Sequence, residues 1–182
     1  MTRDDDDPLA EWVGARYPRA YRTAVLICGN PADAEEALQD AFLRAWRFRD
    51  ALPTGSKGDA WLYRVLVNSC YSKLRREVPR RDRERTRLDV DFDVTSAVEA
   101  SDVAAERSVI ADALGAALEE LPEALRVVVV LRYYADLSER DIATAIRRRP
   151  GTVKSRLHAA RRRLAADPRL AGYAPNLEVT TP

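Results

Sequence analysis

Apolar residues recur at helical spacing through most of this chain. A first stretch begins after Pro8 and repeats its apolar positions every three or four residues, with Pro18 as a point where the helix would bend or divide. A second stretch follows a glycine, where Asn30 is suited to cap a helix and Pro31 to occupy its first position. This second helix is predicted to run to about Phe48.

A third helical stretch follows a predicted loop over Pro53–Gly58 and fades in a basic run before Pro79. Residues 79–106 show no sustained periodicity and change from basic to acidic, which is typical of a flexible linker. We therefore place a domain boundary there, with a first domain over 8–78.

Helical spacing resumes over 107–166. Within it, Ala124–Tyr134 contains four consecutive valines that would also suit a buried strand, but no partner strand is visible, so a helix is favoured. Ser138 and Asp141 resemble a capping box. The predicted fold class is all-α, with two small helical domains joined by a flexible linker and a weakly ordered tail over 167–182.

The segment Leu137–Leu164 has the pattern of a helix-turn-helix, whose second helix can enter a major groove. Nine basic residues and one acidic residue lie between Arg140 and Ala166, which suits contact with phosphates, although a solvated basic helix is the alternative. The apolar stripe expected to pack inward is Val153, Leu157, Ala160 and Leu164. The residues expected to face DNA are Thr152, Lys154, Ser155, Arg156, His158, Arg161 and Arg162.

A second basic block, residues 64–87, holds nine basic and three acidic residues, and an acidic stretch over 89–112 separates it from the first. The third helix mixes rings that stack on exposed bases, an amide that can read a base edge, and cations, a composition that suits unpaired nucleic acid. The residues of this mixture are Trp61, Tyr63, Asn68, Tyr71, Lys73, Arg75 and Arg76. For Trp61, a position in the hydrophobic core is the alternative interpretation.

Residues that would carry covalent chemistry are scarce. His158 is the single histidine, and the glycine motifs of nucleotide-binding loops do not occur, so we expect neither an enzyme nor a cofactor. Cys28 and Cys70 lack metal-ligand spacing, and buried thiols are favoured over a redox switch. Helix-end electrostatics explains the acidic cluster more simply than a metal does. That cluster is Asp33, Glu35, Glu36 and Asp40.

The longest apolar run, Val127–Leu131, is far too short to cross a bilayer. No signal peptide is visible, so we expect a cytoplasmic protein.

Four motifs, in this order, resemble sigma factors of the extracytoplasmic-function group of the sigma-70 family, which keep only regions two and four. Residues Asn30–Arg47 resemble the helix that grips the β′ clamp helices of RNA polymerase. Trp61–Asn68 resembles the helix that recognises the minus-ten element. Leu131–Ser138 resembles the entry to region four, and Gly151–Leu157 the start of the minus-35 recognition helix.

The resemblance implies a factor that brings core RNA polymerase to promoters and initiates transcription. Its partners would be the β′ clamp helices, the β flap, promoter DNA and a possible anti-sigma factor. Asn68 and the loop before Trp61 would engage a flipped minus-ten base, with Arg64 on the same helix, while Lys73, Arg75 and Arg76 would hold phosphates. The polymerase-binding residues would be Asp33, Glu36, Gln39, Asp40, Phe42 and Trp46.

Two residues depart from the family pattern. Arg147 stands where the turn of the helix-turn-helix usually has glycine, which most easily adopts a left-handed conformation. Ala159 stands where many members carry an arginine near the bases. The chain ends soon after region four, so we expect no fused regulatory domain and control by a separate anti-sigma protein or by expression level.

Two alternatives stay open on sequence alone. A helix-turn-helix regulator would bind an operator without polymerase, usually as a dimer that reads paired half-sites. A helical interaction protein would not touch DNA, and its behaviour with promoter fragments would be insensitive to salt.

Overall fold

The computed structural model describes residues 8–53, 55–76 and 101–171, without the side chains of residues 75–76 and 101–108. All regular structure in these residues is helical, which confirms the all-α prediction. The helices are α1 (Pro8–Cys28), α2 (Pro31–Arg47), α3 (Gly55–Arg76), α4 (Ser101–Glu120), α5 (Glu123–Val129), α6 (Glu139–Ala145) and α7 (Pro150–Ala165). Three short turns are η1 (Arg49–Ala51), the π-helical η2 (Val130–Tyr134) and η3 (Pro168–Leu170).

The predicted start of α2 is confirmed in detail. The Asn30 side chain accepts a hydrogen bond from the Asp33 backbone N–H at 2.8 Å, and Pro31 takes the first helical position. Helix α1 is not divided at Pro18, which lies exposed within one continuous helix.

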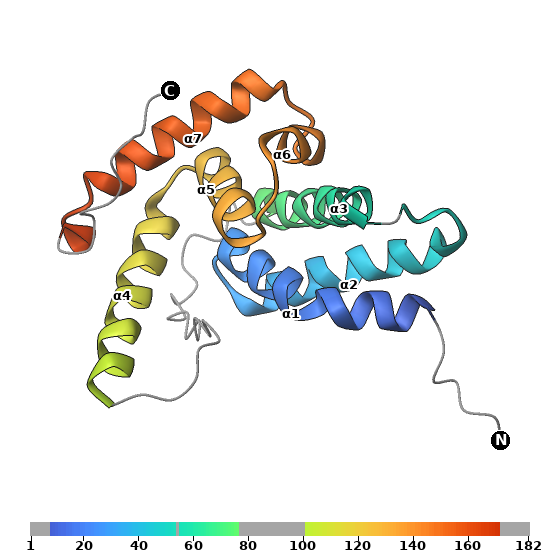
Figure 1. Cartoon of the computed structure of the whole chain (residues 1–182), viewed down its shortest axis with the longest axis horizontal. Helices are drawn as coiled ribbons and strands as arrows, with labels where there is room; N and C mark the ends of the chain where they lie inside the picture. Colours follow the sequence, from blue (N-terminus) through green and yellow to red (C-terminus); the bar gives the residue numbers. More distant parts are fainter. Residues whose placement is uncertain (1–7, 54, 77–100, 172–182) are drawn as a thin grey trace.

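Helices α1, α2 and α3 lie side by side and form the N-terminal unit (Figure 1). Small residues allow the helices to approach closely, since Ala24 of α1 and Ala34 and Ala41 of α2 have no exposed surface. Leu38, Leu62 and Leu66 supply the larger side chains of the core. An amphipathic stripe on each helix therefore becomes one shared interior.

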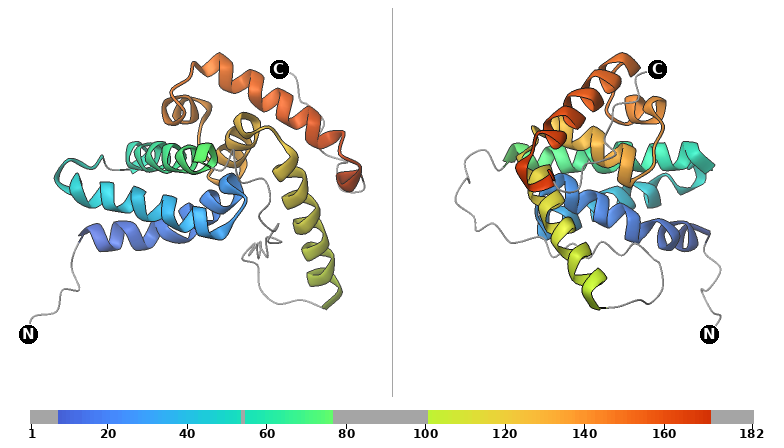
Figure 2. Two further views of the ribbon diagram at one scale, coloured as in Figure 1. Left: turned by 180° about the vertical axis from the view of Figure 1, so that it is seen from behind. Right: turned by 60° about the vertical axis from the view of Figure 1, so that its left-hand side comes forward.

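Helices α4 to α7 form the C-terminal unit, in which α5 packs against α7 and α6 joins them (Figure 2). Ser138 caps α6 by accepting a hydrogen bond from the Asp141 backbone N–H at 3.1 Å, as predicted. The valine-rich segment is helical, so the helix interpretation is confirmed over the strand. The whole predicted stripe of α7 is buried: Val153, Leu157, Ala160 and Leu164.

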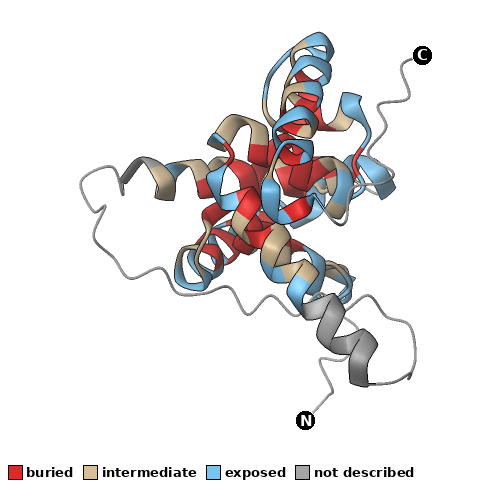
Figure 3. Cartoon of the chain, turned by 90° about the vertical axis from the view of Figure 1, so that its left-hand side faces the viewer, coloured by how far each residue is buried: buried red, intermediate tan, exposed pale blue. Residues whose placement is uncertain are grey.

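The two units are in contact. Helix α6 packs on α3, and η2 packs on α1, where the Arg19 side-chain Nε donates a hydrogen bond to the Tyr134 carbonyl oxygen at 3.0 Å. Buried residues are concentrated at the centre, where the two units meet (Figure 3). The described residues thus share a continuous interior.

Two boundaries differ from those expected. Helix α3 already begins at Gly55, so Gly55–Gly58 is helical and the last four of the six residues predicted as a loop are wrong. Helix α4 begins at Ser101, so residues 101–106 of the expected linker are helical, and residues 77–100 lie outside the described residues. In the expected weakly ordered tail, η3 buries Leu170 against the core, while residues 172–182 are also outside the described residues.

Candidate nucleic-acid interface

The outer face of α7 carries a row of polar and basic side chains opposite its buried stripe. Lys154 and Ser155 near the helix start are exposed, as are His158 and Arg162 further along. Thr152 and Arg156 are half-buried beside them. This face can place short polar groups and cations against base edges and phosphates.

Arg161 differs from the other six predicted residues of α7. It is half-buried, and its Nε is enclosed without a hydrogen-bond partner within the described structure. Its side chain lines an apolar cavity of about 260 Å³ together with Leu114, Leu118 and Leu164. Arg161 therefore lies at the edge between the outer face of α7 and the interior of the C-terminal unit.

The turn between α6 and α7 adopts the left-handed conformation that glycine usually provides. Arg147 has a φ of 52°. Its backbone N–H donates to the Thr144 carbonyl at 3.4 Å, and the Arg148 N–H donates to the Ala143 carbonyl at 2.9 Å. These two bonds are those of a Schellman motif, which ends α6 and directs the chain toward α7.

On α3, Trp61, Arg64 and Asn68 are spaced so that they share one face of the helix, and each is half-buried. Trp61 and Tyr71 also pack partly against the core. The two interpretations of Trp61 are therefore compatible, because its side chain packs against the core and is still partly exposed. The side chains of Arg75 and Arg76 lie outside the described residues.

Lys73 lies apart from that face and is engaged within the protein. Its ammonium donates a hydrogen bond to the Glu36 carboxylate of α2 and forms an ion pair with it. The Lys73 side chain is only 11% exposed, whereas that of Glu36 is 63% exposed. A residue predicted to bind DNA and one predicted to bind polymerase are thus paired with each other.

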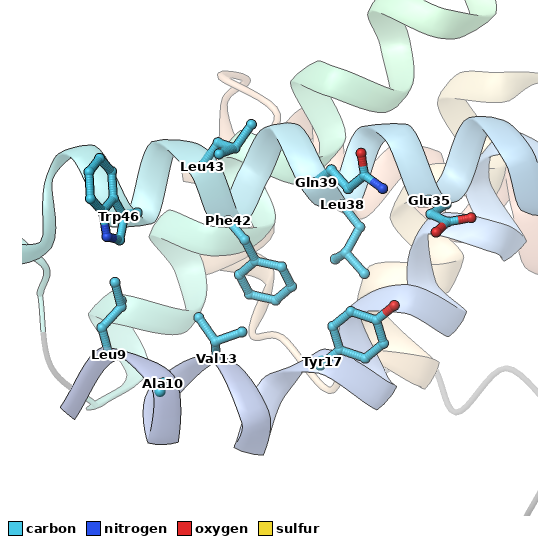
Figure 4. Close-up of a pocket in the computed structure, with 10 residues that line it drawn as sticks. All are labelled: Leu9, Ala10, Val13, Tyr17, Glu35, Leu38, Gln39, Phe42, Leu43 and Trp46. Carbon is cyan, nitrogen blue, oxygen red and sulfur yellow. The ribbon is translucent and has the colours of Figure 1, made fainter. Parts of the chain in front are cut away.

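An apolar hollow of about 560 Å³ lies between α1 and α2 (Figure 4). Phe42 of α2 points toward Val13 and Tyr17 of α1, and Trp46 lies near Leu9 at the other end. The Tyr17 and Phe42 rings stack with their centroids 6.0 Å apart. The exposed aromatic ring of Trp46 and its apolar surroundings have the character of a protein-binding surface.

The structure separates the six predicted polymerase-binding residues into groups. Gln39, Phe42 and Trp46 line the hollow. Asp33 is held at the start of α2, where the Asn30 side-chain amide donates to its carboxylate at 2.5 Å, and Asp40 is exposed. The sequence prediction missed the residues that α1 contributes to the lining, although their four-residue spacing was a detectable signal. These residues are Leu9, Val13 and Tyr17, and Leu43 of α2 was missed as well.

Cys28 and Cys70 are both buried and unbridged, as the sequence interpretation expected. The pKa of the Cys70 thiol is raised well above its ordinary value, mainly by a hydrogen bond with the Cys28 side chain and to a lesser extent by burial. No group of three potential metal-ligating side chains occurs within the described ranges. In the same residues, no helix is long and apolar enough to span a bilayer.

Two family profiles match the chain. Residues 12–80 match the profile for Sigma-70 region 2, and residues 111–164 match that for Sigma-70, region 4. The chain is 35% identical over 182 residues to the ECF RNA polymerase sigma factor SigM of Mycobacterium tuberculosis, covering 94% of this chain and 86% of that one. It is 30% identical over 180 residues to the RNA polymerase sigma-H factor of Pseudomonas aeruginosa, covering 88% and 92%.

The fold is similar to that of a sigma factor, RpoE, solved in complex with the anti-sigma factor NepR from Bartonella quintana. The TM-score is 0.63 at 26% sequence identity, and the match covers 86% of this chain and 93% of that one. CnrH, solved with the cytosolic domain of CnrY, has a TM-score of 0.58 at 20% identity, covering 87% and 85%, which supports the fold alone.

Proposed function

The chain belongs to the extracytoplasmic-function sigma factors of the sigma-70 family, which direct bacterial RNA polymerase to promoters, and from this premise we propose how its surfaces divide that work. We assign region 2 to residues 8–78 and region 4 to residues 107–166, with a linker between them. The two profile matches lie within or close to these ranges and support the assignment.

Helix α7 of region 4 reads the minus-35 duplex in this proposal. Lys154, Ser155 and Arg156 reach base edges or clamp phosphates near the helix start, and Arg162 adds a phosphate contact further along. The exposure of Lys154, Ser155 and Arg162 on the face opposite the buried stripe supports this role, with Arg156 half-buried beside them. Arg161 holds the inner edge of the helix and contributes less to DNA binding.

Helix α3 of region 2 engages the minus-ten element. Asn68, with Trp61 and Arg64 on the same face, binds bases that have left the duplex, and this capture offsets part of the cost of unpairing them. Lys73 binds a DNA phosphate when its ion pair with Glu36 opens, and Arg75 and Arg76 contact phosphates further along the DNA.

Core RNA polymerase binds at two places in this proposal. The β′ clamp helices occupy the hollow between α1 and α2, where Phe42 and Trp46 are the main contacts. The β flap contacts the apolar cavity of region 4, beside Tyr133, whose side chain is 61% exposed. Both surfaces are apolar and lie apart from the outer face of α7.

Two further properties complete the proposal. An anti-sigma factor binds the chain, and the similar sigma factor RpoE, which was solved in complex with the anti-sigma factor NepR, supports this partner. The chain itself catalyses no reaction and acts in the cytoplasm, where polymerase and promoters are found. The polymerase supplies the chemistry of initiation.

The observation that carries the proposal is the exposed basic face of α7 over a fully buried stripe, within the segment that matches region 4. The test is run-off transcription with purified bacterial core polymerase and a pool of promoter fragments. Initiation should depend on the protein and fail in Asn68→Ala and in Lys154→Ala/Arg156→Ala. Arg163→Ala, an exposed α7 residue outside the predicted set, is the matched control. Duplex binding without polymerase binding or initiation would favour an operator-binding regulator instead.

A further inference from the structure

Gly58 sits in the first turns of α3 against the turn that precedes the helix. It is buried, and a methyl group at this position would lie 2.4 Å from the Pro53 carbonyl oxygen and 3.3 Å from its carbonyl carbon. Non-bonded atoms do not approach this closely, and both of these atoms belong to the backbone. Any side chain at residue 58 would therefore displace Pro53.

Trp12 of α1 faces the same point. Its indole Nε1 would lie 3.7 Å from a methyl group at residue 58. This nitrogen is buried and has no hydrogen-bond partner within the described residues. An unpaired buried donor is rarely tolerated without a reason, and here the indole ring packs where α1, α3 and the Pro53 turn converge.

Arg16 fixes Trp12 and ties it to α3. Its guanidinium lies 4.6 Å from the centroid of the Trp12 ring, and its Nη1 donates to the Trp12 carbonyl at 3.2 Å. Its Nε donates to the Asp59 carboxylate at 2.7 Å. The Arg16 and Asp59 side chains are 25% and 40% exposed, so the ion pair is partly shielded from water.

We propose that Gly58, together with the Trp12, Arg16 and Asp59 cluster, positions the Pro53 turn for capture of the flipped minus-ten base during promoter opening. This inference rests on the proposed function, which assigns base capture to α3, the helix that begins directly after Pro53 and Thr54. A Pro53 backbone that is held by α3 before DNA binds does not have to be ordered at the moment of capture, so more of the binding energy is available to separate the strands. These four are positioning residues, because they act through the turn.

The test uses the full chain in holoenzyme with core polymerase. Gly58→Ala is compared with Gly14→Ala, a region 2 helical glycine that has no atom within 4 Å of the added methyl group. Permanganate reactivity of unpaired minus-ten thymines reports opening, and titrations report affinity for core polymerase and for a minus-35 duplex. Initiation is also measured on a template whose minus-ten region is already unpaired.

Gly58→Ala should lower opening at least tenfold, leave both affinities within twofold, and regain most initiation on the unpaired template, whereas Gly14→Ala should resemble the parent. Opening equal to that of Gly14→Ala, or a parallel loss of polymerase affinity, would overturn the inference. Failure of the unpaired template to restore initiation would do the same. These results leave the proposed function intact if Asn68→Ala still blocks opening, whereas a parent protein that opens no promoter defeats the proposed function itself.

Two further variants keep the test decisive if Gly58→Ala does not fold. Asp59→Asn removes the charge that anchors Arg16 and should lower opening several-fold without altering the backbone. Exchanging the pair as Arg16→Asp with Asp59→Arg should restore part of the opening lost in either single variant. An exchange that restores nothing, together with an unaffected Asp59→Asn, would refute the role of the cluster.

Discussion

Replacing Arg147 by glycine should stabilise the C-terminal unit. Arg147 occupies the left-handed region with a φ of 52°, where a residue with a Cβ is disfavoured by about 1–2 kcal/mol. Glycine also has more conformational freedom in the unfolded chain, and this entropy lowers the stability of the folded state by roughly 0.5–1 kcal/mol. It therefore offsets part of the strain that is relieved. The Schellman hydrogen bonds use backbone atoms only and remain in place. The net effect on the free energy of unfolding is an increase of about 0.5–1 kcal/mol.

The assay is urea unfolding followed by circular dichroism, in which the midpoint should rise while the slope stays unchanged. In a thermal scan the same change corresponds to a rise of about 1–4 °C for a chain of this size. Arg149→Gly is the matched control, because it removes the same charge where the backbone has an ordinary φ of −72°. If Arg147→Gly is no more stable than Arg149→Gly, the strain argument is wrong.

Three further outcomes follow from the same geometry. Glu36→Gln should free the Lys73 ammonium and raise affinity for a single-stranded minus-ten oligonucleotide about two- to fivefold, the equivalent of a weak ion pair, with no gain when Lys73 is also alanine. Trp46→Ala should weaken core polymerase binding in a pull-down titration without changing the melting temperature, because the side chain is 57% exposed. Burial raises the pKa of Tyr63, so its contribution to stability is present below the ordinary tyrosine pKa and lost as the pH rises through the raised value. Tyr63→Phe has no ionisable group, so the stability of the parent relative to this variant should fall above about pH 10 in alkaline unfolding curves and stay constant near neutral pH.

Helix positions and caps could be predicted because their causes are local. Asn30 and Ser138 carry out the capping that their neighbours in sequence require, and the stripe of α7 follows from its 3.6-residue period. The start of α3 was misplaced for a physical reason. The glycines near Gly58 were interpreted as a loop, whereas Gly58 is needed inside a helix because the Pro53 carbonyl passes so close.

The candidate site could be predicted one helix at a time but not across helices. The period of α7 shows which side faces outward, yet only the packed structure shows that Arg161 lies at the edge of that side with its Nε enclosed. The pairing of Lys73 with Glu36 joins residues 37 positions apart in the chain, and no local pattern encodes that contact. The α1 side of the hollow was missed for the same reason.

Because α6 packs on α3, region 4 covers part of region 2 and competes with any partner that binds the same part of α3. A partner that needs the α3 surface beneath α6 must displace a neighbour that is covalently attached, and dilution does not remove it. Its effective concentration is on the order of millimolar for short tethers. The measured affinity of the whole chain for such a partner is therefore its intrinsic affinity scaled by the fraction of molecules in which the two units have parted. For a partner of this kind, the free energy needed to separate region 2 from region 4 is subtracted from the free energy of binding.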